Sequence, residues 1–212
     1  MRFDTMPWDK DFNAESFRES CAKAREANRR KGYDSSESGK TFEHQIETAC
    51  KIYEDSNKAS VAKIPEPFRV IKKLAAGRAN VQFLRHADPD FMGAVSNGRC
   101  IVFEAKYTSK DRLETRALTG RQWQALERYW KMAALAGVCC GIQDKYYFVP
   151  WAVFRDMKNI YGRQYVTQED LKPYEVKCTG PAVLFLDYKN PKEAKYAFRK
   201  AKEKANENIE CM

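Results

Sequence analysis

The spacing of apolar residues along the chain predicts several helices. Large apolar side chains that recur every three or four positions form one face of a helix. Phe42, Ile46, Ala49 and Tyr53 follow this spacing closely. The segments expected to be helical are residues 13–31, 40–56, 119–136 (ended by Gly137), about eight residues from Trp151, a short turn at 167–171, and 190–208.

Short runs rich in β-branched and aromatic residues lie between these helices and predict strands. They are residues 58–63, 68–74, 79–85, 138–143, 145–149 and 182–186. Residues 107–117 are charged and are expected to form a polar loop. The mixture of helices and strands places the chain in the α/β class.

The most informative extended segment is a predicted hairpin. Asn97-Gly98 lies between two β-rich runs, and this dipeptide is the strongest local signal for a tight hairpin turn. The hairpin should place Asp90 and Glu104 on adjacent antiparallel strands. Because strand side chains alternate between the two faces, Glu104 and Lys106 should share one face.

The charged residues of this hairpin allow two interpretations. Glu104 and Lys106, with Asp90 beside them, outline a metal-dependent hydrolytic site. Alternatively, the hairpin is an ordinary one that carries a surface ion pair. The second interpretation must explain why charges occur in an apolar strand, where they are seldom buried unless paired or bound to a metal. The spacing alone leaves both open.

Composition narrows the class of protein. The 212 residues, 43% of them hydrophobic, suffice for a domain with a sizeable core. No run approaches the roughly 18 apolar residues of a membrane-spanning helix, and the first residues do not resemble a secretory signal. Seven cysteines without a CxxC pair fit neither a disulfide framework nor a zinc ribbon. They are expected to be reduced thiols in a cytoplasmic protein.

The net charge of +9 is unevenly distributed. Residues 58–87 carry seven basic side chains and one acidic side chain. A focused basic block is the electrostatic footprint of a polyanion-binding protein. Its clustering favours nucleic acid as the partner over a general role in solubility. The basic residues of this block expected to contact DNA are Lys63, Lys72, Lys73, Arg78 and Arg85.

Two further polar residues each have a structural and a functional interpretation. Glu43 is either an acid near a helix N-terminus, where the helix dipole favours it, or a further carboxylate over the site. Gln122 follows Thr119 by three residues, as in a capping box. It also lies on the inward side of its helix, where its amide oxygen could reach a metal or a water bound to that metal.

The order of these motifs resembles the RecU-type Holliday-junction resolvases, which share the PD-(D/E)XK nuclease core. The similarity runs from about Gly39 to Tyr188. The matching motifs are residues 39–43, 63–67, 90–93 and 103–106, and Gln122. Each motif alone is weak, but five in order at compatible spacings are fairly specific.

The resemblance implies a restriction-endonuclease-like α/β fold, a mixed β-sheet flanked by helices with a projecting basic β-stalk at about residues 68–86. It implies a nuclease domain over residues 39–188. A polar helical arm, residues 1–38, and a charged C-terminal helix, residues 189–212, have no clear counterpart in the family. The C-terminal helix is expected to be a solvated exterior helix, and a DNA-facing side is left open.

The resemblance also implies a divalent-metal endonuclease that acts as a homodimer on four-way DNA junctions. The metal is expected to be Mg²⁺, with Mn²⁺ as an alternative. The implied metal ligands are Asp88, Asp90, Glu104 and Gln122. Lys106 is the implied stabiliser of the transition state, and the candidate catalytic set is Lys106, Glu104, Asp90 and Glu43.

Two positions depart from the family pattern. The family usually has threonine where this chain has Asp88, and a carboxylate there can still bind Mg²⁺. Lys40 stands where the family has arginine, so a planar phosphate-binding group becomes a point charge, and Lys40 is a further candidate for contact with DNA.

Three other functions remain open. The first is a nuclease for other branched, nicked or duplex DNA, for example in phage DNA processing. The second is a catalytically silent DNA-binding module, which would bind DNA in a salt-sensitive way without metal-dependent turnover. The third is a structural protein in which the motif occurs by chance.

Overall fold

The computed structural model describes residues 37–84 and 89–210. Three expectations lie outside these residues: the helix over residues 13–31, the DNA contact by Arg85 and the metal ligand Asp88. The helix expected over residues 40–56 is present and spans residues 37–55.

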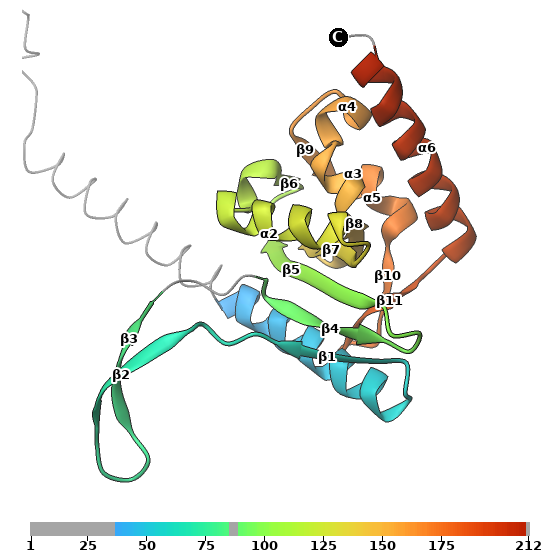
Figure 1. The fold of residues 1–212 in the computed structure, drawn as a ribbon. Helices are drawn as coiled ribbons and strands as arrows, with labels where there is room; N and C mark the ends of the chain where they lie inside the picture. The colour runs from blue at the N-terminus through green and yellow to red at the C-terminus, as the bar shows by residue number, and fades with distance from the viewer. Residues whose placement is uncertain (1–36, 85–88, 211–212) are drawn as a thin grey trace, which may run out of the picture. The chain divides into compact units, whose positions relative to one another are not determined.

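A five-stranded mixed sheet forms the centre of the fold (Figure 1), in the order β1-β4-β5-β7-β8. These strands are β1 (Ala59–Lys63), β4 (Phe91–Val95), β5 (Cys100–Thr108), β7 (Leu135–Ile142) and β8 (Lys145–Pro150). β5 and β7 are parallel, and the other neighbouring pairs are antiparallel. The predicted hairpin is confirmed as β4 and β5, with Phe91 opposite Phe103. The predicted mixed α/β fold is likewise confirmed.

Each face of the sheet is covered by its own apolar layer. On one face lie the helix of residues 37–55 and the pair β10 (Val176–Cys178) and β11 (Val183–Tyr188). The other face carries α2 (Gly120–Lys131), α3 (Trp151–Arg155), α4 (Met157–Tyr161) and α6 (Pro191–Glu210). Figure 1 shows these helices on opposite sides of β4 and β5.

Alternation along β5 decides which side chains meet which layer. Ile101 and Phe103 pack in the layer of the first helix, whereas Val102 packs in the layer of α2. Glu104 is in phase with Val102, so it points towards α2. The expectation that Glu104 and Lys106 share a face is therefore confirmed, and that face is the one beneath α2.

The helix predicted over residues 119–136 is shorter than expected. α2 ends at Lys131, and β7 begins at Leu135. Ala133 has a left-handed φ of 62°, which breaks the helix. β7 lies between β5 and β8 and is buried on both faces, so its apolar run has no alternation that would distinguish it from helix.

The loop predicted over residues 107–117 is also wrong. β5 continues to Thr108, and β6 (Arg112–Glu114) pairs with β9 (Tyr165–Thr167) before the 3-10 turn η1 (Thr115–Ala117). Leu113 is buried in this pair. One apolar residue among charges gives no local strand signal, and the pairing depends on a segment about fifty residues away. The remaining elements are α5 (Gln168–Leu171) and η2 (Lys172–Tyr174).

The predicted basic projection is confirmed as a two-stranded ribbon of β2 (Phe68–Lys73) and β3 (Ala79–Phe83), separate from the five-stranded sheet (Figure 1). Every residue of both strands is exposed. The ribbon is held together by its own pairing and by an edge-to-face contact between Phe68 and Phe83.

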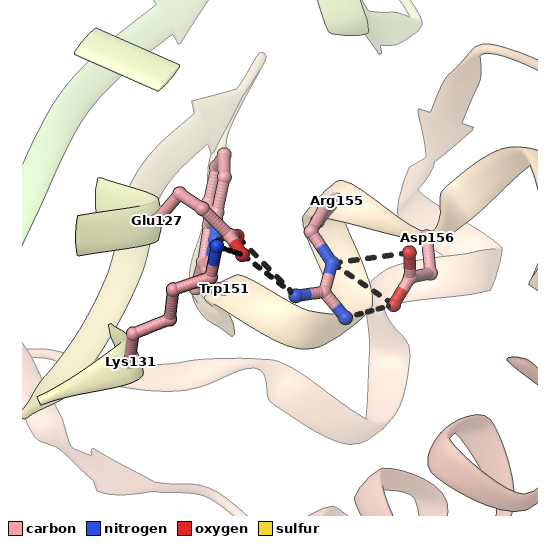
Figure 2. A network of polar contacts seen from close by, with 5 residues as sticks. All are labelled: Glu127, Lys131, Trp151, Arg155 and Asp156. Carbon is pink, nitrogen blue, oxygen red and sulfur yellow. Dashed lines mark hydrogen bonds and ion pairs between the residues drawn. The ribbon is translucent and has the colours of Figure 1, made fainter. Parts of the chain in front are cut away.

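A polar network ties α2 to α3 (Figure 2). Glu127 on α2 accepts a hydrogen bond from Trp151 Nε1 at 2.8 Å and lies 3.2 Å from Arg155 Nη1. Arg155 also pairs with Asp156 at 2.7 Å, and Lys131 Nζ lies 3.6 Å from Glu127. Burial by itself would raise the pKa of Glu127. The hydrogen bond from Trp151 and the hydrogen bond and charge of Arg155 outweigh burial, so the pKa of Glu127 lies below its usual value. This network fixes the orientation of α2 over the sheet.

Two compositional expectations concern membranes and cysteines. Within the part of the chain that the structure describes, no helix is both long and apolar enough to cross a bilayer. The cysteines in that part are free thiols: Cys50, Cys100, Cys139, Cys140 and Cys178.

We expect Gly93→Ala to destabilise the sheet. A Cβ atom at Gly93 would overlap the Ser60 carbonyl oxygen and lie 2.6 Å from Val61 Cα, because β1 approaches β4 closely there. The overlap is with backbone, so the loss should be about 1–3 kcal/mol, or about 2–4 °C in Tm for each kcal/mol. Gly39→Ala is the matched control, since nothing lies within 4 Å of that Cβ. Equal melting temperatures for the two variants would contradict the expectation.

Candidate active site

Four polar residues converge where β4 and β5 meet the start of α2. Asp90 immediately precedes β4, Glu104 and Lys106 lie on β5, and Gln122 lies in the first turn of α2. Asp90 Oδ2 accepts a hydrogen bond from the Ala105 backbone N–H at 3.0 Å. This bond holds the Asp90 carboxylate against β5, between Glu104 and Lys106.

Glu104 is fully buried, which is unusual for a carboxylate. Its Oε2 atom accepts a hydrogen bond from Gln122 Nε2 at 2.6 Å. Its Oε1 atom is buried without a hydrogen-bond partner among the described residues. A buried carboxylate oxygen without a partner is costly, so this atom has an unused position for a ligand.

The electrostatic environment of Glu104 disfavours its charged form. Burial, followed by the neighbouring Asp90 carboxylate, raises the pKa of Glu104 to about 9. Lys106 opposes this shift, because its Nζ atom lies 3.5 Å from Glu104 Oε2 and 3.9 Å from Asp90 Oδ2. Lys106 therefore lies close to both carboxylates, and its single positive charge is too small to neutralise Asp90 and Glu104 together.

Gln122 fulfils its predicted structural role. The Thr119 hydroxyl accepts from the Gln122 backbone N–H, and Gln122 Oε1 accepts from the Thr119 backbone N–H at 3.0 Å, so the capping box is complete. The same side chain reaches the site through its amide nitrogen, which donates to Glu104. Capping thus orients the group that holds Glu104, while ligation of a metal by the Gln122 oxygen stays a prediction.

Glu43 does not have the helix-terminal role that was one of its two interpretations. The helix already includes residue 37, the first residue that the structure describes, so Glu43 lies beyond its first turn, where the helix dipole has little effect. Instead it pairs with Lys63 Nζ at 2.7 Å, and Glu47 lies 3.5 Å from the same atom. The hydrogen bond to Glu43 raises the pKa of Lys63 above its usual value.

Most of these groups line one cleft of about 1000 Å³, whereas Glu104 is buried and does not line it. Asp90, Lys106 and Gln122 lie on one part of its wall, and Glu43 and Lys63 lie on another. The cleft brings together most of the predicted catalytic residues. It also includes Arg121, which sequence reasoning missed. Because Arg121 adjoins Gln122 at the predicted start of a helix, its sequence position could have indicated that it lies near the site.

The predicted DNA-contacting residues occupy different places. Lys63 lies in the cleft wall, and Lys40 is exposed on the first helix. Lys72 and Lys73 are exposed on β2, and Arg78 is exposed in the turn that follows it. Contact of these side chains with DNA stays a prediction.

The residues present fit a divalent cation. Among the described residues, no group of three or more histidines, cysteines or acidic residues is close enough to form a metal site. Asp90 and Glu104 provide two carboxylates, however, and Mg²⁺ is commonly bound by one or two carboxylates with waters in its remaining positions. The unpartnered Glu104 Oε1 and the raised pKa of Glu104 indicate a place where positive charge would be stabilising.

Comparison with known proteins identifies a family of recombination proteins. The family described as RecU, recombination protein U, matches residues 37–192. No curated protein matches the chain. A solved structure of Hjc, a Holliday junction resolvase from the archaeal hyperthermophile Archaeoglobus fulgidus, is 12% identical, with a TM-score of 0.33, over 50% of this chain and 74% of that one. Because the family match spans most of the chain and includes every described residue of the candidate site, the chain belongs to the RecU family of recombination proteins.

Proposed function

We propose that this protein is a divalent-metal-dependent endonuclease that resolves four-way DNA junctions. The observation that carries the proposal is the fully buried carboxylate of Glu104. Its Oε1 atom has no hydrogen-bond partner among the described residues, its Oε2 atom lies 3.5 Å from Lys106 Nζ, and Asp90 and Lys106 open onto a cleft. Membership of the RecU family of recombination proteins supports a role for the proposed activity in DNA recombination.

Asp90 and Glu104 are the residues that would hold the cation, which we propose to be Mg²⁺, with Mn²⁺ as an alternative. Both metals prefer oxygen ligands of this kind. When bound, such a cation lowers the pKa of a coordinated water and offsets negative charge on a phosphodiester.

The chain's own residues prepare the cleft for that charge. The Ala105 N–H fixes the Asp90 carboxylate, and Gln122 fixes that of Glu104. Lys106 is partly exposed, with 22% of its side chain accessible, so its ammonium group can reach a phosphate oxygen in the cleft. There it would stabilise the negative charge that develops as the phosphodiester is hydrolysed.

The basic ribbon and a homodimer complete the proposal. Lys72, Lys73 and Arg78 place positive charge on an exposed projection, which suits the dense phosphates of a junction. Two symmetry-related copies would present two clefts, and paired nicks in opposing strands are the natural product of such a dimer.

The test compares a labelled four-way junction with linear duplex DNA of the same sequence, each with and without Mg²⁺. We expect paired, symmetric nicks in the junction that need the metal, and little cleavage of the linear duplex. Equal cleavage of both substrates would instead indicate a general nuclease. Salt-sensitive binding without any turnover in Mg²⁺ or Mn²⁺ would indicate a DNA-binding module and would overturn the proposal.

A further inference from the structure

The C-terminal helix α6 has two dissimilar sides. Ala194 and Ala201 are buried in the apolar layer between α6 and the rest of that face. Lys204 Nζ donates a hydrogen bond to the Ile160 carbonyl oxygen at 2.5 Å. These contacts hold one side of α6 against α3, α4 and η2, and the described side chains on the opposite side are exposed.

Four basic residues form a row on that other side. Lys192, Lys195, Arg199 and Lys202 follow one another at intervals of three, four and three residues. At 3.6 residues per turn, they occupy an arc of roughly 80° around the helix. All four are exposed, and together they line a shallow surface groove. Figure 1 shows α6 along the edge of its layer, consistent with an accessible row.

Two aromatic rings organise the cationic groups around this row. The Arg199 guanidinium lies 5.6 Å from the centre of the Tyr196 ring, and Lys202 Nζ lies 5.9 Å from that of Phe198. Such cation–π contacts hold long side chains close to the helix surface. Glu203 lies 3.9 Å from Arg199, and because both side chains are largely exposed, this pair offsets little of the charge.

The spacing of the row matches a phosphate backbone. From Lys192 to Lys202 the helix rises about 15 Å, at 1.5 Å per residue. One strand of duplex DNA carries a phosphate every 3.4 Å along the axis, so about four phosphates span the same length. A row of four cations of this length can therefore lie beside several phosphates of a duplex.

We propose that this row on α6 binds the phosphate backbone of duplex DNA outside the cleavage cleft. The family match ends at residue 192, so nearly all of α6 lies beyond it. The inference rests on the proposed function only in that the bound duplex would be an arm of the junction. Contacts to phosphates carry no sequence information, so the row would add affinity for any duplex arm.

The test measures the binding of the full-length protein to plain duplex DNA in chelator, at several salt concentrations. The α6 variant carries Lys192→Gln, Lys195→Gln, Arg199→Gln and Lys202→Gln. A matched control removes four exposed lysines from elsewhere: Lys51→Gln, Lys110→Gln, Lys145→Gln and Lys177→Gln. Each phosphate contact contributes about 0.9 to the slope of log K against log salt. We expect the slope of the α6 variant to be lower than that of the control by about two to four.

A difference in slope smaller than one between the α6 variant and the control would overturn the inference, because both lose the same net charge. Two half variants, Lys192→Gln with Lys195→Gln and Arg199→Gln with Lys202→Gln, should each give about half of the change. If the fourfold variant has a lower melting temperature than the wild type, the salt slopes of the two half variants are compared with the control instead. Junction cleavage is measured separately: a protein that binds through α6 without cleaving would overturn only the proposed function, and a resolvase with an unchanged slope would overturn only this inference.

Discussion

Asp90→Asn is expected to reduce Mg²⁺-dependent junction cleavage by at least about 100-fold. A bound metal contributes several kcal/mol of transition-state stabilisation, and each 1.36 kcal/mol corresponds to a factor of ten in rate. Asparagine retains an oxygen that can accept the Ala105 N–H, which Asp90 accepts at 3.0 Å. The local strand geometry should therefore survive, and the lost charge should be the cause of the effect.

The measurement is single-turnover cleavage of a labelled junction over a range of Mg²⁺ concentrations. Because the variant keeps one carboxylate, Glu104, its remaining activity should need more Mg²⁺ than the wild type. Asp144→Asn, in the exposed turn between β7 and β8, is the matched control and should cleave at the wild-type rate. If Asp90→Asn matched this control, Asp90 would have no part in the metal site.

Glu104→Gln is expected to stabilise the metal-free protein at alkaline pH. The pKa of Glu104 in the folded state is raised to about 9, mainly by burial, whereas an unperturbed glutamate has a value of 4.5. Between these pH values the folded state binds more protons than the unfolded state, so stability falls as pH rises. Glutamine does not titrate, and its carbonyl oxygen can accept the hydrogen bond from Gln122. At pH 8 the carboxyl is mostly protonated in the folded state and ionised in the unfolded state, so removing this titration should add about 1–4 kcal/mol of stability relative to pH 5.

The free energy of unfolding, measured by denaturant titration in chelator at pH 5 and pH 8, checks this expectation. The advantage of Glu104→Gln over the wild type should be small at pH 5 and large at pH 8. Mg²⁺ should stabilise the wild type, more strongly at pH 8, and should have little effect on the variant. Glu54→Gln, an exposed position on the first helix, is the control. An advantage that did not change with pH would mean that the titration of Glu104 is not its source.

The expected loss of cleavage in Asp90→Asn and the expected gain of stability in Glu104→Gln have the same source, which is two carboxylates held close together. Glu104 is buried where its charge is costly, and Asp90 adds a second carboxylate beside it. Lys106 offsets only part of this charge. The proposed cation would offset this cost when bound, because the free energy of metal binding couples to folding.

Local signals in the sequence determined the hairpin and the helix caps. Asn97-Gly98 fixed the turn, and alternation along β5 placed Glu104 and Lys106 on one face. The spacing of Thr119 and Gln122 predicted a capping box, which the structure contains. Each of these features depends on residues within a few positions of one another, so pattern and propensity suffice to predict it.

The boundaries of β7 and the pairing of β6 with β9 depend on contacts with segments far away in the sequence. The apolar run Leu135–Ile142 is a strand because β5 and β8 enclose it, and its own pattern is equally compatible with helix. Leu113 is buried because β6 meets β9. Neither partner is visible in the local sequence.

The candidate site shows the same division. The sequence by itself predicted the residue types of the candidate site: two carboxylates, a lysine and an amide. Only the tertiary structure decided that Glu104 is fully buried, that one of its oxygens has no hydrogen-bond partner among the described residues, and that Glu43 pairs with Lys63. Desolvation and ion pairing depend on how α2 and the first helix pack against β5 and β1, and packing is a property of the whole fold.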